Sequence, residues 1–142
     1  MSKQVIALVV AGLALMCVLC GVGAYLLGVN TLRGYREVTQ TGSRFLTLLQ
    51  QADFRSAVQM IEPSARAKLT EVELRRRWQT LVAAIGEPQS WSAGEFYIYT
   101  TTGGQTATLQ MSVRGSKGEG RVEFKFLYDG TNWQITELRF VW

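Results

Sequence analysis

The chain begins with a long run of apolar residues. No charged residue occurs between Val5 and Val29, and Lys3 carries the only charged side chain before that run. A helix rises about 1.5 Å per residue, so this run would span roughly 37 Å, enough to cross a hydrocarbon core of about 30 Å. The pattern predicts residues 1–30 as a single transmembrane anchor with a short N-terminal tail, and residues 31–142 as one soluble domain.

The apolar run has two other interpretations, a cleaved secretory signal and a lipoprotein signal. A cleaved secretory signal has an apolar core of roughly 7–15 residues, and Val22-Gly23-Ala24 resembles a cleavage site. The run before that site is longer, however, and it continues past the site. A lipoprotein needs a small residue before its cysteine, whereas Cys17 follows Met16 and Cys20 follows Leu19. We therefore expect an uncleaved anchor, with a cleaved signal as the alternative.

The charges on the two flanks of the anchor favour opposite orientations in the membrane. Lys3 favours a cytoplasmic N-terminus, whereas Arg33 and Arg36 on the other flank favour the opposite orientation. A short tail before an anchor is typical of a domain held outside the cytoplasm. We expect an extracytoplasmic domain at a bacterial plasma membrane, with the opposite orientation open.

Small residues recur along the anchor at helical spacing, where they would let another helix approach closely. They form an expected helix-packing face that consists of Cys17, Cys20, Gly21, Ala24 and Gly28.

After the anchor, helical patterns come first. Apolar residues at helical spacing predict a helix over residues 32–50, with Gly28 and Gly34 as positions for a bend. Asp53 is a typical N-cap for a helix over 53–61, which Pro63 would end. Residues 71–85 carry the clearest helical signature. Thr70 and Glu73 form a predicted capping box, and Gly86 is a typical C-terminal cap. The apolar face of that helix is Leu74, Trp78, Leu81, Val82 and Ile85.

From Trp91 the period of the pattern changes to two, which is typical of strands. Strands are predicted over residues 91–101, 106–114, 121–128 and 132–142, with a flexible loop between the second and third. The last strand changes phase near Thr136-Glu137, where a β-bulge would restore the register. The order of elements predicts an α+β fold in which helices pack on a curved antiparallel four-stranded sheet.

Composition excludes several kinds of chemistry. Histidine is absent, and Cys17 and Cys20 both lie in the apolar run. Common zinc sites, thiol nucleophiles and a histidine base are thereby excluded from the soluble domain, and we expect no metal and no cofactor. The net charge of +4 is too small to suggest nucleic acid. A local basic run at Arg75, Arg76 and Arg77 is either a contact for anionic groups or a solvated helix face.

Three groups of residues in the soluble domain resemble small bacterial domains of unknown function in the cystatin-like and nuclear transport factor 2-like superfamily. They are residues 46–58 with Gln51-Ala52-Asp53-Phe54, Trp78 with Ile85-Gly86-Glu87-Pro88, and Tyr128-Asp129-Gly130 with Trp133 and Ile135. The resemblance implies a cone-shaped fold. Enzymes of this superfamily, such as ketosteroid-isomerase-like proteins, place an aspartate or histidine base in the cone. This chain has no histidine, and we assign both aspartates, Asp53 and Asp129, to local structure.

Several residues are candidates for function. Tyr97 and Tyr99 share one face of a strand and are an expected protein-interaction surface. Trp78, Trp91, Phe96 and Trp133 would line an apolar pocket if the cone held one. Glu95, ahead of Glu123 and Glu137, is the carboxylate best placed to act as a base in the cone, but an exposed or ion-paired residue is the favoured interpretation.

We expect a non-enzymatic, membrane-anchored accessory subunit or assembly factor with a protein partner in a larger membrane complex. The alternative is a membrane-tethered module that binds a small ligand or lipid. An isomerase-like enzyme with a glutamate base comes third.

Overall fold

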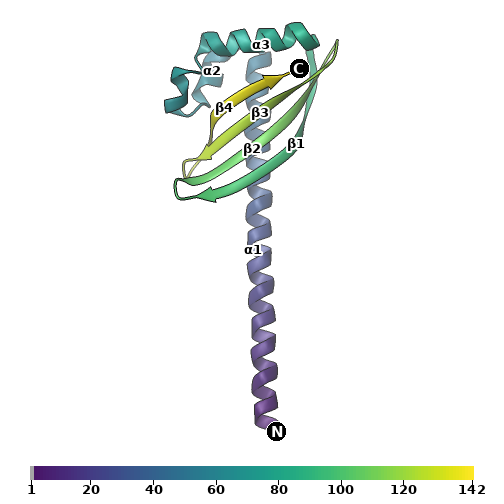
Figure 1. Cartoon of the computed structure of the whole chain (residues 1–142), viewed down its shortest axis with the longest axis vertical. Helices are drawn as coiled ribbons and strands as arrows, with labels where there is room; N and C mark the ends of the chain where they lie inside the picture. Colours follow the sequence, from purple (N-terminus) through teal and green to yellow (C-terminus); the bar gives the residue numbers. More distant parts are fainter. Residues whose placement is uncertain (1) are drawn as a thin grey trace. The chain divides into compact units, whose positions relative to one another are not determined.

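The computed structural model describes residues 2–142, except for the side chains of residues 27–30. The chain divides into two compact units, Met1–Gly34 and Tyr35–Trp142. The first helix, α1 (Lys3–Gln50), contributes to both units (Figure 1).

In the first unit, α1 carries the apolar run. The side chains of residues 2–26 are exposed, and an 18-residue window of α1 has a mean hydropathy of 2.9. Among the described residues, α1 is the one helix long and apolar enough to cross a bilayer, a criterion that a signal sequence would also meet. The predicted bend positions Gly28 and Gly34 both lie within α1.

The second unit is an α+β domain, as predicted. It contains the C-terminal part of α1, three further helices and one sheet. The remaining elements are α2 (Phe54–Gln59), the 3-10 helix η1 (Pro63–Ala67), α3 (Glu71–Ile85), β1 (Pro88–Thr101), β2 (Gly104–Gly115), β3 (Glu119–Tyr128) and β4 (Trp133–Val141).

Local capping explains the helix boundaries. Asp53 accepts a hydrogen bond from the Ser56 backbone N–H at 3.2 Å and thereby caps α2. Gly86, at φ 84°, ends α3 with its N–H on the Val82 carbonyl. The helix predicted over 53–61 is two residues too long at its C-terminal end. Ile61 instead forms a β-bridge with Ile135, and the turn after it continues into η1, which the pattern did not predict.

The predicted capping box at α3 is half right. Thr70 accepts a hydrogen bond from the Glu73 N–H at 3.2 Å, as expected. The Glu73 carboxylate turns along the helix instead, because Arg76 and Arg77 each donate to it at 2.7 Å. Three charge-assisted bonds from guanidinium groups outweigh one bond to a backbone amide at the helix start.

The four strands form an antiparallel meander in the order β1-β2-β3-β4. The predicted bulge in β4 is confirmed: Lys125 pairs with Glu137 and Phe126 with Ile135, which leaves Thr136 as the extra residue. Two further register shifts, not predicted, lie in β1, one at Gln89 and one at Gly94-Glu95. At the second shift, both Gly94 and Glu95 lie opposite the single residue Gln110. Ala93 before them and Phe96 after them therefore have their side chains on the same face of the sheet.

The segment between β2 and β3 is not the flexible loop that the sequence predicted. It is a short turn bonded to the end of α3: the Lys117 and Gly118 N–H groups both donate to the Ile85 carbonyl, at 2.7 and 3.0 Å. β2 therefore extends to Gly115 and β3 begins at Glu119. β1 also begins earlier than predicted, at Pro88, since an edge strand tolerates proline.

The core lies between the helices and one face of the sheet, here called the inner face. Gly42 of α1 approaches it so closely that an added Cβ would lie 2.9 Å from Met111 Sδ. Phe124 stacks on Phe126 at 5.4 Å between ring centroids and meets Phe45 of α1 edge-on at 5.8 Å. In the part of the chain that the structure describes, no polar or charged residue is fully buried. The core is thus an ordinary apolar one.

Candidate functional site

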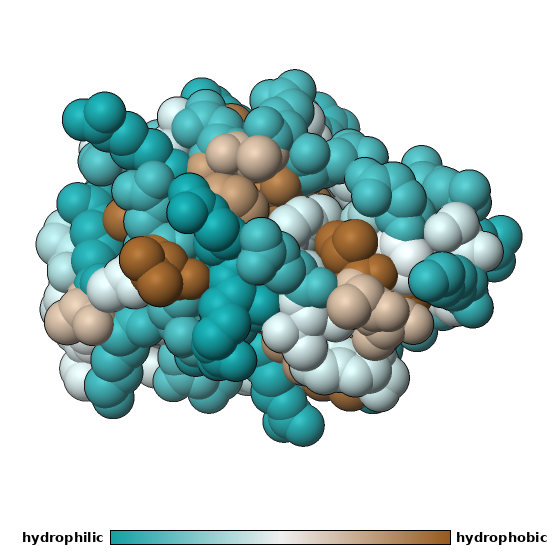
Figure 2. Space-filling model, turned by 90° about the horizontal axis from the view of Figure 1, so that it is seen from above, coloured by the Kyte–Doolittle hydropathy of each residue, from teal (hydrophilic) through white to brown (hydrophobic). Residues whose placement is uncertain are grey.

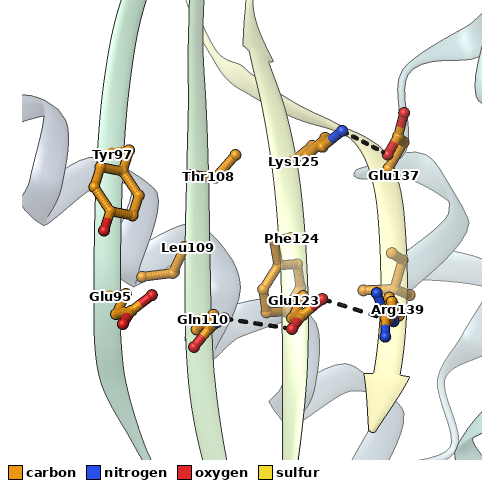
Figure 3. Close-up of a pocket in the computed structure, with 11 residues that line it drawn as sticks. Glu95, Tyr97, Thr108, Leu109, Gln110, Glu123, Phe124, Lys125, Glu137 and Arg139 are labelled. Atoms are coloured by element: carbon orange, nitrogen blue, oxygen red, sulfur yellow. Dashed lines mark hydrogen bonds and ion pairs between the residues drawn. The ribbon is translucent and has the colours of Figure 1, made fainter.

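The opposite face of the sheet, here called the outer face, carries two rows of polar side chains. The strand register aligns one residue from each strand in each row (Figure 3). The first row is Glu95, Gln110, Glu123 and Arg139, and the second is Tyr97, Thr108, Lys125 and Glu137. The alternation of each strand directs these side chains away from the core.

Hydrogen bonds and ion pairs connect most of these side chains. Gln110 Nε2 donates to Glu123 Oε1 at 3.3 Å, and Arg139 Nε lies 3.8 Å from Glu123 Oε2. Lys125 Nζ pairs with Glu137 Oε2 at 3.1 Å. The two ion pairs involve largely exposed basic side chains, so each contributes little to stability. Among the charged side chains of the two rows, Glu95 is the one that no hydrogen bond or ion pair joins to another described residue.

The two rows enclose a shallow cavity of about 300 Å³, whose floor consists of Leu109, Phe124 and Leu138. Three glutamates and two basic residues line it, which leaves one excess negative charge. Since the other two glutamates have basic neighbours, the excess charge lies at Glu95 on β1. The cavity is therefore suited to a positively charged group at that side.

Tyr97 and Tyr99 lie on the outer face of β1, as the alternation predicted. Their side chains are 55% and 50% exposed, whereas Phe96 and Ile98 turn to the inner face and are half-buried. From Tyr35 onward, the other large hydrophobic side chains found exposed are Tyr35, Val72 and Trp142, which lie on separate elements. The face of the molecule seen in Figure 2 is mostly hydrophilic, with small separate apolar patches. The two tyrosines are thus an unusual neighbouring pair.

The aromatic residues predicted to line a pocket mostly pack against other groups. Trp78 meets Phe140 at 6.4 Å, and Phe96 meets Tyr35 at 5.2 Å, between ring centroids. Trp133 packs on a tyrosine, Tyr128.

Two of the aromatic residues predicted to line the pocket, Trp133 and Trp91, differ in their surroundings. The Trp133 Nε1–H donates to Glu37 Oε2 at 3.2 Å, while Trp91 is half-buried. None of the cavities found in the described part of the chain brings Trp78, Trp91, Phe96 and Trp133 together.

Trp133 does border a second, polar groove of about 650 Å³ that the sequence did not predict. Its wall comes from α1, the end of α2 and the hairpin before β4. Polar groups there include Gln40, Arg44, Gln59, Asn132 and Gln134. No sequence pattern connects these three distant segments.

The three arginines of the predicted basic contact are largely engaged within the domain. The Arg75 guanidinium lies 5.2 Å from the centre of the Phe54 ring. Arg76 and Arg77 bind Glu73, and their hydrogen bonds lower the pKa of that carboxyl to about 2. Arg77 also donates to the Leu138 carbonyl at 2.9 Å. The run is therefore less free to meet an anion than its sequence suggests.

The expected helix-packing face lies in the first unit. Cys17, Cys20, Gly21 and Ala24 are exposed on α1, and both cysteines are free thiols. Gly28 lies among the residues whose side-chain surroundings fall outside the described part.

The two aspartates have local structural roles, as the sequence predicted. Asp53 caps α2, and hydrogen bonds from Ser56 lower its pKa. Asp129 accepts hydrogen bonds from the backbone N–H groups of Asn132 and Thr131, and both bonds lower its pKa.

Glu95 is exposed on the outer face, which agrees with the favoured interpretation of an exposed residue and not with a base inside the cone. Among the described residues, no group of three or more cysteine, aspartate or glutamate side chains is arranged to hold a metal ion.

Comparisons with known proteins identify the fold. No family model matches the chain, and no curated protein matches its sequence. A solved structure of a protein from Catenulispora acidiphila is similar with a TM-score of 0.52 and 11% identity, over 78% of this chain and 92% of that one. The structure of Aln2 from a Streptomyces species is similar with a TM-score of 0.51 and 12% identity, over 77% of this chain and 90% of that one. At such low identity the likeness extends to the fold alone.

Proposed function

We propose that this chain is a non-enzymatic, membrane-anchored accessory subunit or assembly factor. In this proposal the apolar part of α1 spans a bilayer, and the domain lies outside the cytoplasm. The outer face of the sheet then binds a protein of a larger membrane complex. The observation that carries the proposal is the pair of exposed tyrosines beside an uncompensated glutamate on an otherwise structured polar face.

The apolar helix supports the membrane part of the proposal. Its side chains are exposed along residues 2–26. An apolar surface of that length in water would be strongly unfavourable, whereas a bilayer or another apolar helix would cover it.

The core supports a role in binding over one in catalysis. In the superfamily that the sequence resembles, enzymes place their acids and bases inside the cone. The corresponding inner face here consists of apolar side chains such as Leu109, Met111, Val122 and Phe126, all at most 1% exposed. A base in that interior would need a polar partner or a cavity, and the packed side chains supply neither.

The tyrosines support the choice of surface. Tyrosine is enriched at protein interfaces because it combines a large apolar ring with a hydroxyl that forms hydrogen bonds. Tyr97 and Tyr99 lie on the same face, and Tyr97 also borders the cavity with Glu95. A partner that covers them would bury aromatic surface near the centre of its contact, where most binding energy is concentrated.

Site-specific photocrosslinking in native membranes tests the proposal. A benzophenone amino acid would replace Tyr97 or Tyr99 in the full-length chain, and Gln79, exposed on α3, would be the matched control position. We expect a discrete crosslinked product with the same partner protein from both strand positions, and none from position 79. A protein that yields no such product, and that is strictly monomeric after extraction in detergent, would contradict the accessory role.

The alternative role, a membrane-tethered module for a small ligand or lipid, has less support. It requires an apolar cavity in the cone, whereas Trp78 and Trp133 are 6% and 7% exposed and pack against neighbouring rings.

A further inference from the structure

The two edges of the sheet differ in how they are protected. At β4, the segment after α2 covers the edge: the Glu62 N–H donates to the Ile135 carbonyl at 2.8 Å, and the Ile135 N–H donates to the Met60 carbonyl at 3.0 Å. The β4 strand also has a bulge at Thr136. Covered edges, bulges and charges all prevent the addition of another strand.

The edge at β1 has little of this protection after its bulge. Residues 96–101 read Phe-Tyr-Ile-Tyr-Thr-Thr, with high β propensity and no charge. They pair in continuous register with β2 on one side. On the other side, no described segment forms a backbone hydrogen bond with them. This edge therefore presents a row of backbone N–H and C=O groups that can accept a further strand.

We propose that an extended segment of the partner protein adds to β1 as a fifth strand along residues 96–101. The inference rests on the proposed function, because it specifies how the partner binds there. In such an addition the backbone hydrogen bonds supply affinity, and the side chains on alternate positions supply specificity.

The side chains around this edge indicate the chemistry of that segment. Side chains directly opposite each other on neighbouring strands lie about 5 Å apart. A lysine or arginine beside Glu95 would neutralise the one uncompensated carboxylate of the outer-face cavity. Next to Tyr97 and Tyr99, β-branched or aromatic residues would form favourable cross-strand pairs. The partner segment is thus an extended, largely uncharged strand with one basic residue near its end.

Designed peptides test this mode of binding. The probe is a synthetic eight-residue peptide of alternating threonine and valine with one lysine. A second peptide has glutamate in place of that lysine, and a third is N-methylated at alternate residues. Binding to the isotope-labelled full-length chain in detergent micelles is followed by amide chemical shifts and hydrogen exchange.

We expect the lysine peptide to shift the amides of residues 95–101 and to slow their exchange. The glutamate peptide should bind about two- to fivefold more weakly, the range of an exposed ion pair. The N-methylated peptide should not bind, because it cannot form the backbone hydrogen bonds. Glu95→Gln should abolish the difference between lysine and glutamate peptides. Glu71→Gln, exposed at the start of α3 and away from the sheet edge, is the matched control and should leave the difference unchanged.

Three results would overturn the inference: equal binding of the N-methylated peptide, shifts confined to another part of the domain, or a charge preference that persists in Glu95→Gln. Concentration-dependent protection of residues 96–101 without peptide would also overturn it, since a second copy would then occupy the edge. The crosslinking experiment separates the two proposals. If crosslinks from positions 97 and 99 form while the peptides fail to bind, the accessory role stands and strand addition is wrong. If those crosslinks are absent and the extracted protein is strictly monomeric, the accessory role itself fails.

Discussion

The turn between β2 and β3 makes a sharp prediction about one glycine. Gly115 approaches the end of α3 so closely that an added Cβ would lie 2.3 Å from the Ile85 carbonyl oxygen and 2.8 Å from its carbonyl carbon. Both atoms belong to the backbone, so a rotamer change cannot relieve the contact. Gly118, three residues later in the same turn, has no atom within 4 Å of its added Cβ.

The cost of Gly115→Ala follows from what must move. Separating the turn from α3 would lengthen the hydrogen bonds from the Lys117 and Gly118 N–H groups to the Ile85 carbonyl, now 2.7 and 3.0 Å. Each such bond contributes roughly 0.5–1.5 kcal/mol, and an overpacked site costs about 1–3 kcal/mol more. We expect the free energy of unfolding to fall by roughly 2–6 kcal/mol, with a decrease in Tm of at least about 8 °C.

Tryptophan fluorescence during thermal unfolding of the full-length chain in detergent measures this effect. All four tryptophans lie at or after residue 78, so the signal reports on the domain and not on the apolar segment. Gly118→Ala is the matched control, and it should leave Tm unchanged or raise it slightly, because alanine restricts the unfolded chain. Equal Tm values for the two variants would refute the argument that the close approach of the Ile85 backbone requires glycine at position 115.

Three further predictions concern the core, the pH response and the anchor. Phe124→Ala removes a ring that stacks on Phe126 at 5.4 Å, and should lower the free energy of unfolding in urea by about 3–5 kcal/mol; an unchanged midpoint would contradict the described packing. Arg76 and Arg77 hold the pKa of Glu73 at about 2, below its ordinary value of 4.5, so this pairing stabilises the domain above pH 4.5 and is lost as the pH falls toward 2. Glu73→Gln should therefore lower Tm at pH 7 and reduce the fall in Tm between pH 5 and 2; parallel pH profiles would show that the pairing has no effect. Replacing Leu13 with arginine should release the full-length chain from membranes in alkaline carbonate, whereas Leu13→Ile should not, and equal retention of both variants would contradict a spanning helix.

The boundaries that depend on local chemistry could be predicted from the sequence. The helix over 71–85 has the predicted bounds because Thr70 and Gly86 determine its ends through their own backbone neighbours. The β4 bulge could also be predicted, since the apolar residues change phase at Thr136. The bulge in β1 leaves a similar signal, because Trp91 and Phe96 are out of phase across Gly94, but an edge strand shows weaker alternation.

Features that depend on contacts between distant segments could not be predicted in this way. The turn after β2 looked flexible because its own residues are small and polar, yet its order comes from the end of α3. The side of the sheet on which Glu95 lies could not be derived from alternation alone, because its orientation depends on an extra residue in the pairing with Gln110. On the outer face the alternation indicated which side chains share a surface, but only the strand register aligns Glu123 with Arg139 and Lys125 with Glu137.

The position of α1 in the core has a consequence for biosynthesis. Val38, Phe45, Leu46 and Leu49 leave the ribosome well before the sheet of the same core, whose first strand begins at Pro88. Until then the sheet cannot cover their apolar stripe, and some of the latest contacts, such as that between Glu37 and Trp133, join residues 96 positions apart. Such distant contacts slow folding. The nascent domain therefore passes through an interval in which this amphipathic stretch is vulnerable to aggregation, and a nearby lipid surface would shield it while translation finishes.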